Sequence, residues 1–281
     1  MAFIAAYFVL GRASLLVATV HISSSPVWPP AGFAIGLLVL FGLRYWPTVL
    51  IGAFAVNATT LGDPGASALI AGGNTLEAVA AAWLILRMGG PDVLERMAGV
   101  GGFFGAALTG AIISATVGVG ALVATGTPSS LFWGIWQTWM LGNLAGTLLV
   151  GPAMLAIRAP RRSIIAAPVV AAILGMAAFA TIGWSLVLLL PLVAWLSIRL
   201  RRDGLTAGLV GLGAGAVAMT LLGLGPFWAR EANEALLLLQ LFLIGASVTA
   251  LTLSAGVHRR AHRASLASLG GAALAIGPLV A

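Results

Sequence analysis

Apolar residues in this chain form long runs that are separated by short joints rich in polar residues, glycine or proline. A transmembrane helix needs about 20 mostly apolar residues, and a shorter run is acceptable where Gly, Pro or charge marks a turn. The pattern predicts ten membrane spans, at about residues 2–20, 29–43, 47–61, 67–87, 101–124, 132–157, 164–182, 184–200, 205–224 and 235–256. The joints "RYWP" and "IGW" are the weakest, so eight spans are the alternative. The predicted fold class is all-α, a polytopic integral membrane helix bundle.

The arginines occupy alternate joints of this pattern, after the even-numbered runs. They are Arg44, then Arg87 and Arg96, then Arg158, Arg161 and Arg162, then Arg199, Arg201 and Arg202, and finally Arg259, Arg260 and Arg263. The opposite joints together hold one arginine, Arg230. Because basic loops stay in the cytoplasm, both termini are predicted to be cytoplasmic. The first run lacks the basic start of a signal peptide and a good cleavage site, so we expect a retained helix.

Composition agrees with a membrane protein and excludes some chemistry. The chain is 60% hydrophobic and 7% charged, which excludes a water-soluble globular domain of this length. Its 37 glycines suit helices that pack closely in a bilayer. It has no cysteine, so disulfides, thiolate metal sites and cysteine nucleophiles are excluded.

Polar side chains inside the predicted spans are the candidates for a functional site, because each needs a partner or a wet cavity. Asn74 and Glu77 are three residues apart and share a helix face, and Trp136 and Asn143 share another. Arg12 and Glu77 have opposite charge and lie well inside their spans, which favours an ion pair between them. The alternative is that these polar groups only fix the register of the helices.

The outer segment "SPVWPP" adds a further candidate. Pro26, Pro29 and Pro30 exclude a regular helix, and Trp28 between them suits an amphipathic plug at the outer mouth of the bundle. Our hypothesis is that this segment folds back over a cavity with a polar floor. The predicted ligand-binding or signalling residues are Trp28, Asn57, Asn74, Glu77, Trp136, Asn143 and Arg12. A rigid interfacial turn is the alternative for this segment.

Catalytic and metal-binding patterns are absent from the sequence. His258 and His262 have the spacing of a two-histidine metal face, but the neighbouring arginines would repel a cation, so a solvated juxtamembrane helix is favoured. No phosphate loop, Ser-His-Asp set or pair of intramembrane acids is present. We therefore expect no enzyme, no cofactor, no metal and no nucleic-acid partner.

Five ordered blocks resemble the first type of the membrane-associated sensor (MASE) domain family. They are "SPVWPPAGFAIGLLVLFGLRYWPTVLIGAFAVN", "GGNTLEAVAAAWLILR", "WMLGNLAGTLLVGPAML", "PLVAWLSIRLRRDG" and "LLLLQLFLIGASVTALTL". The resemblance implies a sensory input domain of the bacterial inner membrane that signals to a cytoplasmic histidine kinase or diguanylate cyclase, with a homodimer as the family-level expectation. Residues 1–257 would form the sensor, and residues 258–281 a short cytoplasmic tail without an output domain, so that either the partner is a separate protein or the sequence is a fragment. The stimulus does not follow from the resemblance.

A small-solute permease or transporter subunit is the alternative function. Ten helices with buried polar groups permit it, whereas the lack of an internal repeat and the scarcity of intramembrane carboxylates weigh against it.

The C-terminal tail is predicted to stay at the membrane surface. Arg259, Arg260 and Arg263 should hold the end of the last span at anionic lipid headgroups. Residues 265–281 are apolar but marginal in length for a crossing, and they contain a Gly pair and Gly277-Pro278. We expect them to lie along the interface or against the bundle, without forming an eleventh span.

Overall fold

In a computed structural model, the described part of the chain consists of α-helices, short 3-10 helices and irregular segments, with no strand. The structure describes residues 1–16, 25–157, 169–171, 173–174, 176–177, 193–200, 202–227 and 231–276, and from residue 258 onward only the backbone. The helices are α1 (Ala2–Leu15), α2 (Pro29–Phe41), α3 (Trp46–Leu61), α4 (Pro64–Arg87), α5 (Met97–Ala124), α6 (Phe132–Ala156), α9 (Arg202–Leu221) and α10 (Ala232–Ile276). Short 3-10 helices, η1 (Leu43–Tyr45), η2 (Gly90–Glu95) and η3 (Ser129–Leu131), lie in three of the joints.

These helices lie at eight of the ten predicted positions. The seventh and eighth predicted spans fall mostly outside the described residues. Five described helices are long and apolar enough to cross a membrane, namely α4, α5, α6, α9 and the Asn233–Val257 part of α10. The weak "RYWP" joint is a real break, because α2 ends at Phe41 and Gly42 adopts a φ of 104° that suits glycine.

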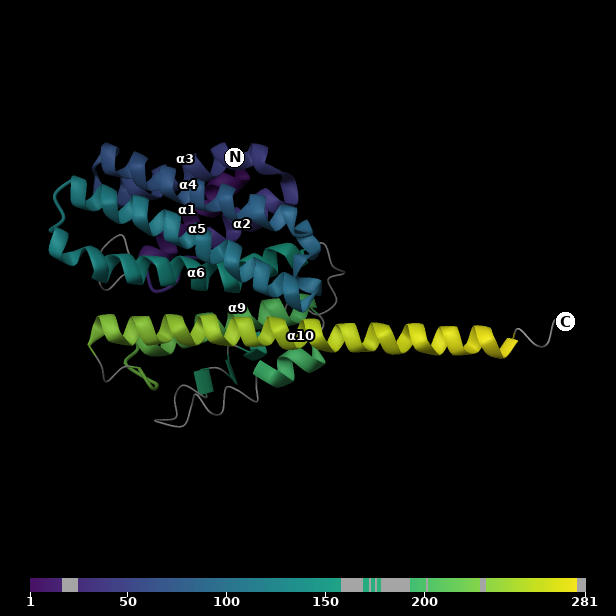
Figure 1. The fold of residues 1–281 in the computed structure, drawn as a ribbon. Helices are drawn as coiled ribbons and strands as arrows, with labels where there is room; N and C mark the ends of the chain where they lie inside the picture. Colours follow the sequence, from purple (N-terminus) through teal and green to yellow (C-terminus); the bar gives the residue numbers. More distant parts are fainter. Residues whose placement is uncertain are drawn as a thin grey trace.

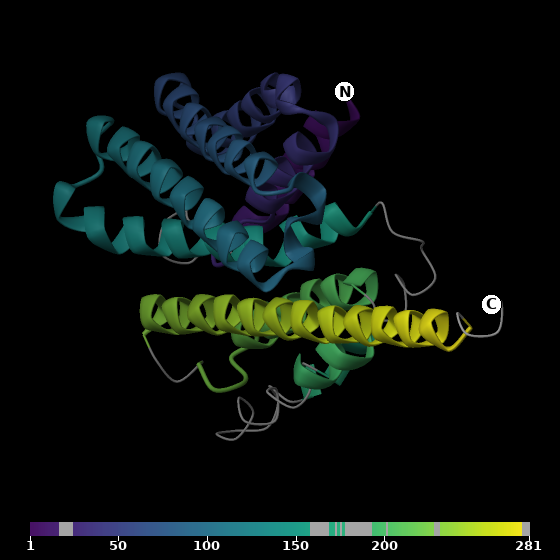
Figure 2. The ribbon, with the colours of Figure 1, turned by 45° about the vertical axis from the view of Figure 1, so that its right-hand side comes forward.

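The helices form one packed body from which α10 projects (Figure 1). Helices α1 to α5 lie on one side of α6, and α9 and α10 lie on its other side, in both views (Figures 1 and 2). The closest associations pair α4 with α5, α2 with α6 and α3 with α4. Helix α2 is apolar around its whole circumference and is buried from Pro30 to Val39 except at Phe33. It is therefore the centre of the first group of helices.

Several Arg-bearing joints meet at one end of this body. Phe3 at the start of α1 packs on Phe41 and Tyr45, with ring centroids 5.2 and 5.9 Å apart, beside the joint that holds Arg44. The joint η2, which precedes Arg96, contacts α2, α6 and α10. Helix α10 leaves the body at the same end as the last turn of α6 (Figure 1). This grouping is the arrangement that the alternating arginines require.

Residues 25–28 are not helical, and they pack directly on the backbone of α6. The amide of Trp28 donates a 3.0 Å hydrogen bond to the carbonyl of Gly142. Two glycines one turn apart on α6 permit this approach: a Cβ at Gly142 would lie 2.6 Å from the carbonyl oxygen of Ser25, and one at Gly146 would overlap the carbonyl of Trp28. The non-helical backbone is thus covered by protein, as the low polarity of a membrane interior demands.

Helix α10 corrects the prediction for the C-terminal tail. It runs unbroken for 45 residues, a length of about 68 Å at 1.5 Å per residue, against a hydrocarbon core of about 30 Å. Its last part points away from the other described helices in both views (Figures 1 and 2). The prediction that the tail packs against the bundle is therefore wrong for residues 265–276, whereas a position along the membrane interface stays a prediction. The Gly270-Gly271 pair weakens a helix by only about 1 kcal/mol per residue, which its Ala- and Leu-rich surroundings can offset.

Candidate functional site

A buried hydrogen-bond network joins α4, α5 and α6, and we call its five residues the polar centre: Asn74, Glu77, Ser114, Trp139 and Asn143. The amide nitrogen of Asn143 donates to Glu77 Oε2 at 2.6 Å and to Ser114 Oγ at 3.0 Å. Ser114 Oγ donates to Asn74 Oδ1 at 2.8 Å and accepts from Trp139 Nε1 at 3.3 Å. All five side chains are buried. The network therefore fixes the relative positions of three helices through buried side chains.

Helical spacing and small residues on α5 bring these side chains together. Asn74 and Glu77 are three residues apart on α4, and Trp139 and Asn143 are four apart on α6, so each pair projects from one face. Gly110 and Gly118 lie one turn either side of Ser114. A Cβ at Gly110 would be 3.0 Å from the carbonyl oxygen of Glu77, and one at Gly118 would be 2.7 Å from the Trp139 ring. The glycines let both neighbouring helices approach Ser114 closely enough for hydrogen bonds.

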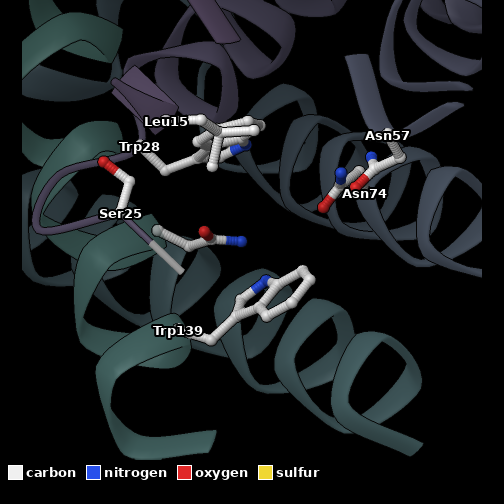
Figure 3. Close-up of a pocket in the computed structure, with 7 residues that line it drawn as sticks. Leu15, Ser25, Trp28, Asn57, Asn74 and Trp139 are labelled. Atoms are coloured by element: carbon white, nitrogen blue, oxygen red, sulfur yellow. The ribbon is translucent and has the colours of Figure 1, made fainter. Parts of the chain in front are cut away.

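A small pocket opens beside the polar centre. It is lined by Leu15, Ser25, Trp28, Asn57, Asn74, Trp139 and Asn143. Trp28 and Leu15 lie on one side of it, Trp139 lies opposite, and Asn57 and Asn74 lie close together at a third side (Figure 3). The space available to water centres is about 10 Å³, which is about what one water molecule needs.

The hydrogen-bonding groups around this pocket are partly unused. Glu77 is 1% exposed, and its Oε1 has no hydrogen-bond partner among the described residues. Asn57 donates its amide nitrogen to the carbonyl of Ala53 in its own helix at 2.9 Å. Asn143 uses its amide nitrogen on Glu77 and Ser114. The carbonyl oxygens of Asn57 and Asn143 are thus left as acceptors in the pocket wall.

Most of the predicted site residues come together, and two do not. Trp28, Asn57, Asn74 and Asn143 line the pocket, and Glu77 is bonded to Asn143. Trp136 lies elsewhere, because its Nε1 donates to Thr116 Oγ1 at 3.1 Å and its ring packs edge-on against Trp133. Its place is taken by Trp139, which is only one turn from Asn143.

Arg12 does not pair with Glu77. Its guanidinium donates to Thr60 Oγ1 at 2.8 Å and to the carbonyl of Thr59 at 3.4 Å, near the end of α3. The side chain is only half-buried, and the C-terminal carbonyls of α3 offer an uncompensated acceptor for a cation. The expected ion pair is therefore wrong: Arg12 is bonded at the end of α3, and Glu77 is bonded to Asn143.

Replacement of Arg12 by glutamine should consequently have little effect on the polar centre. We expect Arg12→Gln to lower the free energy of unfolding by less than about 1 kcal/mol, as for other partly exposed charges. In a double-mutant cycle with Glu77→Gln, the coupling energy should stay below about 0.5 kcal/mol, because the two side chains share no partner. Unfolding in mixed detergent micelles measures both quantities. A coupling energy of about 2 kcal/mol or more would show that Arg12 and Glu77 do form an ion pair.

Helix α10 contacts the same region through Gln240, which is fully buried. Its amide nitrogen donates to the carbonyl of Pro26 at 2.9 Å and to the carbonyl of Thr138 at 3.0 Å. One side chain of α10 thus holds both the non-helical segment that carries Trp28 and the turn of α6 that carries Trp139.

Sequence reasoning missed Ser114 and Trp139 as members of the site. A serine in a helix usually bonds to its own backbone, so its type gives little signal. The usable signal for Ser114 was its spacing, because Gly110, Ser114 and Gly118 form a stripe of small residues on α5.

Within the described part of the chain, no group of three His, Cys, Asp or Glu residues is arranged to hold a metal ion.

Comparison with known proteins identifies the family. The sequence model of the MASE1 family matches residues 1–261, which is almost the whole chain. Searches of curated proteins and of solved structures found no significant match. MASE1 is a family of membrane-associated sensory domains, and the apolar helices of this chain fit a multi-pass membrane protein. The chain therefore belongs to the MASE1 family.

Proposed function

We propose that this chain is a sensory input domain of the bacterial inner membrane. It detects a stimulus at the polar centre and passes the change along α10 to a cytoplasmic histidine kinase or diguanylate cyclase. Membership of the MASE1 family supports the sensory role. The end of the body where the Arg-bearing joints meet is the cytoplasmic end in this proposal, so both termini face the cytoplasm.

The observation that carries the proposal is the double hydrogen bond of Gln240. A change of occupancy or packing in the pocket moves Trp28 or Trp139, and both backbones next to these residues are bonded to the same amide on α10. One bond to the non-helical segment and one to α6, both from the same buried amide, resist independent motion of the three segments, because a broken bond leaves a polar group unsatisfied in an apolar medium. A displacement on one side of α6 is thereby imposed on α10.

Continuity of α10 supports the second half of the path. The helix extends without a break from Ala232, past Gln240 and out of the body to Ile276. A helix transmits a rotation or a shift along its axis more rigidly than a loop does, which makes it a suitable output element for a two-state bundle.

An output fusion tests this proposal. A cyclase catalytic domain joined after Ala281 should give a cyclic dinucleotide level that depends on the state of the bundle. We expect Gln240→Leu to change that level by at least about fivefold, the lower range of typical coupling between sites. The matched control is Leu241→Met on the exposed face of the next position. Output equal to that of the parent at equal amounts of folded protein in the membrane would refute the role of α10.

A further inference from the structure

We propose that the pocket binds a single ammonium ion, with Glu77 as its counter-charge. The inference rests on the proposed function and deepens it, because it names the chemical class of the stimulus. It is built from the charge of the site, its hydrogen-bond acceptors and its size.

Charge is the first argument. The carboxyl group of Glu77 is buried between α4, α5 and α6, and no Arg or His of the described part is bonded to it. Arg12, the partner that the sequence predicted for Glu77, is bonded to α3. A buried carboxylate without a positive partner carries a large desolvation penalty, which an adjacent cation reduces. An ionised Glu77 therefore carries one uncompensated negative charge, and a monovalent cation balances it.

Hydrogen bonding is the second argument. The Oδ1 atoms of Asn57 and Asn143 belong to side chains that line the pocket, and neither accepts a hydrogen bond from a described residue. Asn74 uses its Oδ1 on Ser114 and is no ligand in this assignment. The ammonium ion, like the ammonium group of lysine, has hydrogen-bond donors and no acceptor, so unpaired acceptor atoms suit it. The indole rings of Trp28 and Trp139 line the pocket and add the attraction of an aromatic ring for a cation.

Size and ligand number are the third argument. The pocket admits about one water molecule, and an ammonium ion is close to water in size. Calcium takes six to eight oxygen ligands and magnesium an octahedral set, whereas the pocket wall offers two free amide oxygens, and the carboxyl of Glu77 adjoins it only through Asn143. A larger quaternary ammonium ion would not fit, and it would have no donor to offer.

Thermal unfolding of the full chain in detergent tests the proposal. Ammonium chloride should raise Tm in a saturable way against sodium chloride at the same ionic strength, since a ligand that binds only the folded state stabilises it. Potassium chloride and tetramethylammonium chloride should leave Tm at the sodium value. An equal rise in Tm with potassium would show that the bound ion needs no hydrogen-bond donors and would refute the ammonium assignment. No rise in Tm with ammonium would refute the ion site.

Variants locate the binding site. Glu77→Gln keeps an acceptor for Asn143 but removes the charge, so half-saturation should require at least about tenfold more ammonium. Asp63→Asn is the matched control, because Asp63 caps the same helix α4 at its start, away from the pocket. If Glu77→Gln cannot be purified, Asn57→Ala replaces it, since Asn57 bonds only to its own helix. Unchanged ammonium dependence in these variants would place the ion elsewhere and refute the assignment.

The outcome separates this inference from the proposed function. Binding of ammonium without any effect of Gln240→Leu on the output fusion would support the ion site and refute signalling through α10. An effect of Gln240→Leu in a protein that ammonium does not stabilise would refute the ion site and leave the sensory role in place.

Discussion

Replacement of Gly146 by alanine is expected to destabilise the folded protein by about 3 kcal/mol, the upper part of the usual range for overpacking. The added methyl group would overlap the main-chain carbonyl of Trp28, which has no rotamer with which to move away. The segment must shift from α6 as a whole, and the bond from the Trp28 amide to Gly142 would then lengthen or break. Unfolding in mixed detergent micelles measures the loss.

The matched control is Gly134→Ala on the same helix. A Cβ at Gly134 meets no atom within 4 Å, so this variant should be as stable as the parent or slightly more stable, because alanine is the better helix former. Equal stability of the two variants would show that the close approach of residues 25–28 to α6 does not exist in the folded protein.

Much of the fold could be predicted from the sequence because a bilayer imposes strong rules on composition. Runs of apolar residues had to be helices, and Gly42 and the prolines at 29 and 30 marked joints that the structure shows. The course of α10 beyond residue 257 could not be predicted in the same way. Its Arg-rich exit indicated a membrane boundary, but a boundary does not require a helix to end.

The candidate site was predicted in part, for a related reason. The cost of burying Asn74, Glu77 and Asn143 in lipid implies that they lie inside the bundle, and they do. Pairing is harder to predict, since it depends on the rotation of each helix. The rotation of α1 about its axis places Arg12 against the end of α3, where it is bonded to Thr60 and not to Glu77. The residue types along a helix do not reveal this rotation.

Asn143→Leu should reveal how strongly the polar centre holds α4, α5 and α6 together. We expect a loss of about 3 kcal/mol in the free energy of unfolding, measured without ammonium, because the substitution leaves both carboxyl oxygens of Glu77 without a partner. Asn57→Leu is the control for the same change in the pocket wall. It removes only a bond within α3 and should reduce stability by less than about 1 kcal/mol.

The double variant Glu77→Leu with Asn143→Leu distinguishes an unpaired polar group from a packing defect. Removal of both partners eliminates the buried carboxyl, so the double variant should be more stable than Asn143→Leu alone. Ser114 would keep its bonds to Asn74 and Trp139 in either background. If the double variant instead loses as much stability as Glu77→Leu and Asn143→Leu lose together when made singly, the stability of this region comes from the shape of the side chains. The hydrogen bond between Asn143 and Glu77 would then not hold the helices together.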